Sequence, residues 1–287
     1  MHECQATPSF PDKARFVETV IDENVQLAEK TYRVRFRCPE IARAVLPGQF
    51  VMLRLAGCHD PLFGRPLAVY DVVDESIDVV YLVVGKMTSR LADLDPDTRI
   101  EVWGPLGNGF PTTPVRHLIM VAGGIGQTPF LTMGAEYLGQ RQFGQPVRAC
   151  PKAERVTLCY GARSKDFLAG VDDFRKLGVE VRLATDDGSQ GYAGLVTELI
   201  EPAVAEFGST ESTRIVACGP EPMLRAVVEV ARRLDLPCQV SLETPMACGM
   251  GICFSCVTKI LGVDGNWDYR RTCVDGPVFD GHRVVFD

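Results

Sequence analysis

The stretch HLIMVAGGIGQTPFLTMGAEYL, residues 117–138, decides the fold of the middle of the chain. Its apolar beginning is typical of a buried strand, and its end is typical of a helix. Between them, Gly123, Gly124 and Gly126 let the chain turn tightly and approach a pyrophosphate, which the N–H groups of a helix N-terminus attract. The turn departs from the G-x-G-x-x-G fingerprint, so a glycine-rich turn without a ligand is the alternative interpretation.

Three more short apolar segments follow this stretch, and helical segments lie between them. The expected strands are 156–162, 179–187 and 214–220, and the expected helices are 164–177, 194–207 and 221–234. Strands that alternate with helices predict a doubly wound parallel sheet. Because ligands bind at the carboxyl ends of the strands in such a sheet, we expect the polar turns there to form one cleft. Cys218 would lie at its edge, where a buried thiol without a ligand is the alternative.

The residues that precede the glycine-rich stretch carry short strand-like runs divided by turns rich in glycine and proline. Tyr32, Val34 and Phe36 alternate with polar residues, as in a half-buried strand. Many short strands of this kind predict an antiparallel barrel. A third texture, rich in glycine and cysteine, begins near Gln239. The expected parts are an N-terminal tail over 1–14, a barrel over 15–113, an α/β part over 114–238 and a small third part over 239–287.

Four of the 11 cysteines crowd near the C-terminus, at Cys248, Cys253, Cys256 and Cys273. The first three follow the C-x4-C-x2-C spacing of plant-type [2Fe-2S] clusters, whose fourth cysteine lies further along the chain. Glycines between the first two cysteines allow the backbone to wrap a compact cluster without an obstructing Cβ. A structural zinc site is the main alternative, although four-cysteine zinc sites usually use two short pairs and this chain has one. Ordinary thiols are the other alternative.

The composition indicates a soluble protein. The 287 residues include 30 basic and 37 acidic side chains, a net charge of −7, which argues against nucleic-acid binding. No apolar run approaches the roughly 20 residues that span a bilayer, so we expect no membrane segment. The first residues lack the pattern of a secretory signal, and an odd number of cysteines does not suit a disulfide framework. A reduced, cytoplasmic setting is expected.

Two motifs of the expected barrel suit a phosphate group. GRPLAVYDV places Arg65 and Pro66 just before a strand, and YLVVGKMTSRL ends a strand in a turn of glycine, serine and threonine. An arginine and a turn rich in N–H groups can together hold a flavin pyrophosphate. A solvated arginine at the surface is the alternative.

The motifs RPLA, GKMTSRL, GPLGNGF, AGGIGQTPFL and CGPEPML, followed by the cysteine cluster, occur in the order seen in the ferredoxin–NADP reductase superfamily. Over about residues 15–287 the chain resembles one branch of it, the electron-transfer subunits of type B dihydroorotate dehydrogenase. ETPMACGMGICFSC and the closing RRTCVDGPVF carry that resemblance. It implies a FAD-binding barrel, a nicotinamide-binding α/β domain and a small [2Fe-2S] domain, which together make an oxidoreductase component.

The resemblance also implies roles for particular residues. FAD would contact the two barrel motifs, at Arg65, Pro66, Leu67, Ala68, Tyr81, Leu82, Val83, Gly85, Met87 and Thr88. NAD(H) would contact the glycine-rich turn and the CGPEP loop, at Gly123, Gly124, Gly126, Thr128, Pro129, Cys218, Gly219 and Pro220. No side chain is expected to act as a nucleophile, because the cofactors carry the electrons. The implied partner is an FMN-containing catalytic subunit of pyrimidine biosynthesis, in a heterotetramer of two chains of each kind.

Two residues depart from the family pattern. Ala68 stands where relatives usually have a serine near the flavin, and Met87 stands where they often have a glycine, so the pyrophosphate turn is expected to differ. NADH is favoured over NADPH by family analogy only, because Arg163 suits a 2′-phosphate as well as it suits solvent. The alternative functions are a stand-alone ferredoxin reductase, the small subunit of a ferredoxin–NADP transhydrogenase, and a non-catalytic module with a structural metal.

Overall fold

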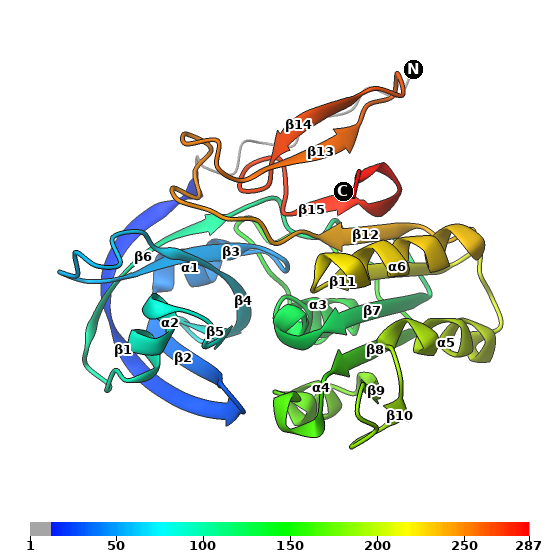
Figure 1. Ribbon diagram of the computed structural model, residues 1–287, viewed down its shortest axis with the longest axis horizontal. Helices are drawn as coiled ribbons and strands as arrows, with labels where there is room; N and C mark the ends of the chain where they lie inside the picture. The colour runs from blue at the N-terminus through cyan, green and yellow to red at the C-terminus, as the bar shows by residue number, and fades with distance from the viewer. Residues whose placement is uncertain (1–12, 287) are drawn as a thin grey trace.

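The computed structural model describes residues 13–286, so the tail expected over residues 1–14 lies almost entirely outside the described residues. Figure 1 shows a barrel beside a helix-flanked sheet, with a hairpin above them. The closed antiparallel barrel, the parallel sheet and the small cysteine-rich segment confirm the predicted fold class. No helix among residues 13–286 is long and apolar enough to cross a bilayer.

Six antiparallel strands close into the barrel. They are β1 (Arg15–Ala28), β2 (Thr31–Arg37), β3 (Phe50–Leu55), β4 (Arg65–Val73), β5 (Ser76–Leu82) and β6 (Arg99–Leu106), arranged in the order β1-β2-β5-β4-β3-β6. Alternate residues of a strand point inward, so Val34 and Phe36, two residues apart on β2, are both fully buried. Ile41 from helix α1 (Pro39–Ala44) and Leu91 from helix α2 (Lys86–Ala92) complete this apolar core.

The second part is a seven-stranded sheet. In spatial order its strands are β10 (Tyr192–Ala193), β9 (Glu180–Thr185), β8 (Arg155–Ala162), β7 (His117–Gly123), β11 (Thr213–Cys218), β12 (Cys238–Ser241) and β15 (Val278–Asp280). Neighbouring strands run parallel, except that β15 pairs antiparallel with β12. The chain moves outward from β7 to β10 and then crosses to the other side of β7 with β11. That reversal makes a switch point between β7 and β11, where open α/β sheets bind their ligands.

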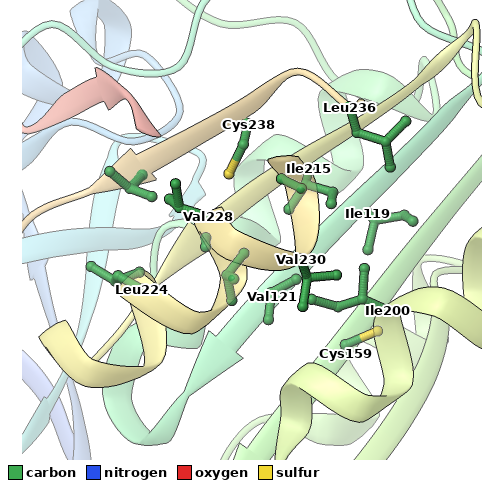
Figure 2. Packing of buried hydrophobic residues seen from close by; sticks show 14 of the residues in the cluster. Ile119, Val121, Cys159, Ile200, Ile215, Leu224, Val228, Val230, Leu236 and Cys238 are labelled. Atoms are coloured by element: carbon green, nitrogen blue, oxygen red, sulfur yellow. The ribbon is translucent and has the colours of Figure 1, made fainter. Parts of the chain in front are cut away.

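Helices cover both faces of this sheet. α3 (Phe130–Tyr137) and α4 (Val171–Lys176) pack on one face, and α5 (Ile200–Phe207) and α6 (Glu221–Arg233) pack on the other. Figure 2 shows the second face, where Leu224 and Val228 of α6 belong to one cluster with Val121 and Ile215 of the sheet. Leu224 and Val228 lie four residues apart, so they share one side of the helix. The apolar stripe of α6 therefore fixes which of its sides meets the sheet.

Two helices are shorter than the sequence predicted. Residues 164–177 form a 3-10 turn at Lys165–Phe167 and then α4, with Gly170 in a left-handed conformation at φ 70° just before α4. Residues 194–207 form a 3-10 turn at Val196–Leu199 that continues into α5. Apolar periodicity over so few residues does not distinguish a 3-10 turn from an α-helical turn.

The C-terminal residues leave the sheet and return to it. After the cysteine-rich loop, β13 (Val257–Leu261) and β14 (Trp267–Arg271) form an antiparallel hairpin, and the chain then re-enters the sheet as β15. The boundary expected before residue 239 therefore falls inside β12. The change in composition near Gln239 lies within that strand, and composition does not reveal that β12 and β15 pair with each other.

We expect Leu224→Ala to lower the free energy of unfolding by about 2–5 kcal/mol, because it empties a buried position between α6 and the sheet. Chemical denaturation followed by circular dichroism measures this change. Arg225→Ala, on the exposed side of the same helix, is the matched control and should change it by less than about 0.5 kcal/mol. Equal losses in the two variants would contradict the packing of α6 on the sheet.

Candidate functional site

A first cleft of about 780 Å³ opens between the barrel, the sheet and the cysteine-rich loop. The barrel supplies one wall from β4, β5 and the start of α2. The residues expected at FAD line this cleft with the exception of Val83; they are Arg65, Pro66, Leu67, Ala68, Tyr81, Leu82, Gly85, Met87 and Thr88. Phe63, Ile125 and Glu243 line it as well, although none of them was expected to contact FAD. Their positions depend on which loops meet in space, which a linear motif does not record.

Arg65 is the one cation among the described residues that line the first cleft. Its Nη1 donates hydrogen bonds to the carbonyl oxygens of Phe63 at 3.0 Å and Gly64 at 3.1 Å. These bonds hold the guanidinium at the start of β4. Its remaining N–H groups make no other hydrogen bond within residues 13–286, and a guanidinium with free donors suits a phosphate.

The segment GKMTSRL was expected to form a turn, and that prediction was wrong, because the segment forms helix α2. Met87 lies in the first turn of this helix and packs into the barrel core with 1% of its surface exposed. Its backbone is helical, so no glycine-only angle is needed at this position. The hydroxyl of Thr88 accepts hydrogen bonds from the N–H groups of Val84 and Gly85, both at 3.1 Å. Thr88 therefore fixes the chain where it enters α2.

A second cleft of about 1010 Å³ lies along the carboxyl ends of the parallel strands. Gly124 after β7, Arg163 after β8, Asp186 after β9 and Pro220 after β11 all line it. Four loops that are far apart in the sequence thus meet at one edge, as the parallel topology predicts. This cleft has the position expected for a dinucleotide.

The residues expected at NAD(H) are divided between the two clefts. Those that line the second cleft are Gly123, Gly124 and Pro220, and those that line the first are Thr128, Pro129 and Cys218. Gly126 and Gly219 line neither. The glycine-rich turn therefore separates the clefts, with its beginning on one side and its end on the other.

The three positions of the AGGIG turn that carry glycine do so for different structural reasons. Gly124 has φ 54°, and a Cβ there would point into open space. A Cβ on Gly123 would lie 2.6 Å from Sδ of Met223, and a Cβ on Gly126 would lie 2.1 Å from the carbonyl oxygen of Cys218. Only Gly124 thus leaves room for an approaching ligand. Gly123 and Gly126 let the turn pack against the loop that follows β11.

Cys218 ends β11 and lies opposite Ser241 of β12, and both residues line the first cleft. Burial raises the pKa of the Cys218 thiol well above its usual range, so the thiol stays protonated. A neutral thiol is a weak nucleophile. The thiol of Cys218 is therefore poorly suited to act as a nucleophile.

The two clefts share a wall. Leu82, Val84, Ile125 and Glu243 line both of them. A group bound in one cleft would therefore be separated from a group in the other by these side chains at most.

Cys248, Cys253 and Cys256 lie in the loop between β12 and β13, residues 242–256, and Cys273 follows β14. Sγ of Cys256 is 3.2 Å from Sγ of Cys273, and both residues are buried against the barrel residues Phe50 and Met52. Burial raises the pKa of the Cys273 thiol to about 12. A metal centre must supply positive charge there to make thiolate ligands of this buried pair.

The other two cysteines are more open to solvent. Sγ of Cys253 lies 3.1 Å from the hydroxyl oxygen of Ser255, and hydrogen bonds from Ser255 lower the pKa of the Cys253 thiol to about 6. Sγ of Cys248 accepts a hydrogen bond from the N–H of Met250 at 3.4 Å. Backbone and hydroxyl donors thus surround these sulfurs, as thiolate ligands require.

Two glycines shape this loop as the sequence predicted. Gly249 has φ 73°, and a Cβ there would lie 2.6 Å from Cγ of Met52. Gly251 has φ 84°, and a Cβ there would lie 2.5 Å from a methyl group of Val274. The loop can pack against the barrel and against the segment that carries Cys273 only where both side chains are absent.

The donor set fits a two-iron cluster, because four cysteines are present and three of them have the C-x4-C-x2-C spacing. Within residues 13–286, no three His, Cys, Asp or Glu side chains converge on a point that could hold one ion. The zinc alternative needs four ligands around one ion. A four-cysteine [2Fe-2S] cluster divides its ligands between two irons, and Cys256 and Cys273, whose sulfur atoms lie 3.2 Å apart, are neighbouring ligands in this donor set.

The cysteine loop also lines the first cleft. Met246, Ala247 and Ser255 belong to the lining, and Ser255 is the residue that contacts Cys253. Trp103 of β6 donates a hydrogen bond from Nε1 to the carbonyl oxygen of Cys248 at 2.9 Å. The second cleft, the first cleft and the cysteine loop are therefore contiguous.

Comparison with known families agrees with this arrangement. Residues 120–229 match the oxidoreductase NAD-binding domain, and residues 243–285 match the iron-sulfur cluster binding domain of dihydroorotate dehydrogenase B. A solved structure of an NADH-dependent reduced ferredoxin-NADP oxidoreductase superposes with a TM-score of 0.78 at 29% identity, covering 94% of this chain and 90% of that one. A ferredoxin NADP+ reductase from Neisseria gonorrhoeae shares the fold, with a TM-score of 0.63 at 19% identity over 76% of this chain and 91% of that one. The fold and the site define an NAD(H)-dependent oxidoreductase component.

The sequence relatives narrow this class. The dihydroorotate dehydrogenase B (NAD(+)) electron transfer subunit of Desulforamulus reducens is 35% identical over 91% of this chain and 95% of its own length. The subunit of the same name from Geobacillus kaustophilus is 36% identical over 90% of this chain and 94% of its own length. The chain belongs to the family of dihydroorotate dehydrogenase B electron transfer subunits.

We expect Gly126→Ala to destabilise the protein by about 3 kcal/mol or more, because its Cβ would overlap the backbone at Cys218, which has no flexible end to move away. Gly124→Ala is the comparison, since its Cβ meets open space and carries only the strain of a left-handed angle, about 1–2 kcal/mol. Urea unfolding of both variants measures the difference. A Gly124→Ala variant that is less stable than Gly126→Ala would contradict the close contact between the turn and β11.

Proposed function

We propose that this chain moves electrons between NAD(H) and an FMN-containing dihydroorotate dehydrogenase catalytic chain, through bound FAD and a [2Fe-2S] cluster, in pyrimidine biosynthesis. One observation carries the proposal: the second cleft shares wall residues with the first, and the first shares wall residues with the cysteine loop. Sites in this order suit a relay from a nicotinamide, through a flavin, to an iron–sulfur cluster. The name of the relatives, electron transfer subunit, supports the existence of a catalytic partner.

The residues of the first cleft fit a flavin dinucleotide. Arg65 offers free guanidinium N–H groups to a pyrophosphate, and β4 and β5 offer an apolar wall to a ring system. The hydroxyl oxygen of Thr244 is buried and has no hydrogen-bond partner within residues 13–286, although Thr244 lines the cleft. Thr244 therefore offers an unpaired hydroxyl in the cleft that Ala68 also lines. Bound FAD supplies the exchange between two-electron and one-electron transfer.

The residues of the second cleft fit a nicotinamide dinucleotide. Gly124 leaves room for a pyrophosphate where the turn follows β7. Arg163 and Asp186 line the same cleft from neighbouring strand ends, and both are exposed. In this proposal, Cys248, Cys253, Cys256 and Cys273 are the iron ligands.

The surface of the cysteine loop suits a docking site for the partner. Met250, Ile252 and Phe254 expose 40%, 75% and 62% of their surfaces, and they lie between or beside the cluster cysteines. Exposed apolar side chains gathered in one place are typical of a protein interface. A partner bound there would bring its own flavin close to the cluster. We further propose a heterotetramer of two chains of each kind, and a cytoplasmic location where thiolates stay reduced.

A second candidate function is the small subunit of an electron-bifurcating ferredoxin–NADP oxidoreductase. The likeness to the NADH-dependent reduced ferredoxin-NADP oxidoreductase structure favours it. The two functions differ in the partner, because one needs an FMN-containing chain and the other needs a large iron–sulfur chain. Copurification from the native host decides between them.

Protein purified without oxygen should contain FAD and about two iron atoms per chain, and NADH should bleach the visible absorption of both. Anaerobic titration with NADH, followed by absorption spectroscopy and iron analysis, measures this. Cys256→Ser should lose the iron while it keeps flavin, because it removes one of the buried cluster ligands. Cys150→Ser, at a cysteine away from the loop, is the matched control and should keep both. Fresh material with neither iron nor flavin would overturn the proposed function.

Ile252→Asp should weaken binding of the FMN-containing partner by about tenfold or more, because it places a charge in the apolar docking surface. Titration calorimetry with the purified partner measures the affinity. Val263→Asp, at the fully exposed turn of the β13–β14 hairpin, is the control and should leave the affinity unchanged. Equal weakening by both changes would argue against docking at the cysteine loop.

A further inference from the structure

The side chains in the wall shared by the two clefts differ in polarity. Leu82, Val84 and Ile125 are apolar, and Glu243 is the one ionisable side chain that lines both clefts. Glu243 stands two residues after Ser241, which ends β12 and is the partner of Cys218 in the sheet. A group that extends from the second cleft into the first along this shared wall would lie near this carboxylate.

Glu243 has no partner of opposite charge. It makes no hydrogen bond and no ion pair in the part of the chain that the structure describes. The cations of the clefts, Arg65, Lys30 and Arg163, form no ion pair with it either. The surrounding protein raises the pKa of the carboxyl group through desolvation. Glu243 is nevertheless exposed in the free protein. A ligand that fills the clefts would take its carboxylate out of water, which is unfavourable, and a cationic group in that ligand would offset the cost.

The proposed substrate offers such a cation in only one of its two redox states. Loss of a hydride, which carries one proton and two electrons, turns the neutral dihydronicotinamide ring of NADH into the cationic ring of NAD+, and both electrons pass to the flavin. The rest of the dinucleotide keeps its charge. A negative charge at the ring thus distinguishes NAD+ from NADH, whereas charges at the phosphates or riboses do not.

We propose that Glu243 sets the preference of this protein for oxidised over reduced nicotinamide, by placing a carboxylate beside the ring where the two clefts meet. The inference rests on the proposed function, since it assumes that the second cleft holds NAD(H). The apolar neighbours strengthen the effect, because a filled cleft excludes water and an attraction between charges grows as the local dielectric falls. Glu243 is here a specificity-determining residue that contacts the ring, and it accepts no proton in the reaction.

The test compares two ligands that differ in ring charge. Holoprotein with FAD and cluster is titrated with NAD+ and with 1,4,5,6-tetrahydro-NAD, a neutral analogue that cannot give a hydride. Glu243→Gln keeps the shape of the side chain and removes its charge. We expect this variant to bind NAD+ about tenfold more weakly and the neutral analogue less than about threefold more weakly. Glu243→Asp keeps the charge and should restore most of the preference for NAD+.

Asp186→Asn is the matched control, because Asp186 lines the second cleft but not the first. It should change the affinities for both ligands by the same factor, since it lies away from the shared wall. A Glu243→Gln variant that binds both ligands, with the same ratio of affinities as the unchanged protein, would overturn the inference and leave the proposed function standing. Unchanged holoprotein that binds neither ligand would overturn both. Thermal unfolding and the flavin spectrum check that each variant is folded.

Discussion

The backbone of the cysteine loop packs directly on the barrel at a glycine. This contact keeps the cysteines next to the first cleft. Gly249 brings the loop so close to Met52 that a single added carbon would meet the side chain at 2.6 Å, and the indole of Trp103 holds the carbonyl of Cys248 at 2.9 Å. If this loop stood away from β3 and β6, the sulfurs would no longer border the first cleft. Electron transfer between cofactors would then have to cross a gap filled by solvent. The barrel thus supports the cysteine loop and also forms a wall of the cleft that suits a flavin.

The parallel sheet meets the barrel at its switch point, and this arrangement explains why two clefts share a wall. The AGGIG turn leaves β7 and packs directly on the end of β11, where Gly126 touches the backbone of Cys218. The turn therefore presents Gly123 and Gly124 to the second cleft, and the residues that follow it, Thr128 and Pro129, line the first. Ile125, in the middle of the turn, lines both. The backbone of this one turn would position both an electron donor bound in the second cleft and an electron acceptor bound in the first.

Much of this could be predicted from sequence because the decisive signals are local. The cysteine spacing and the glycine-rich turn each lie within a short stretch of sequence, and the alternation of strands with helices repeats along residues 117–234; the fold class followed from them. The role of Met87 could not be predicted, because a helix and a turn place that side chain differently and the motif alone does not distinguish them. Glu243 was missed for another reason: its neighbours Leu82 and Ile125 are far away in the sequence. The pairing of β12 with β15 was missed because β15 has only three residues.

The pairing of β12 with β15 has a consequence for how such proteins are assembled from parts. Ser241 and Val278 are partners in the antiparallel ladder, so the 36 intervening residues, 242–277, leave and rejoin the sheet at adjacent positions. An excursion whose ends are neighbours can be replaced by a tight hairpin without pulling its supporting strands apart. The segment that contains the four cluster cysteines is therefore an insertion between two paired strands of the reductase fold. A chain of this architecture can gain or lose the cluster that passes electrons to another enzyme when this one segment is exchanged.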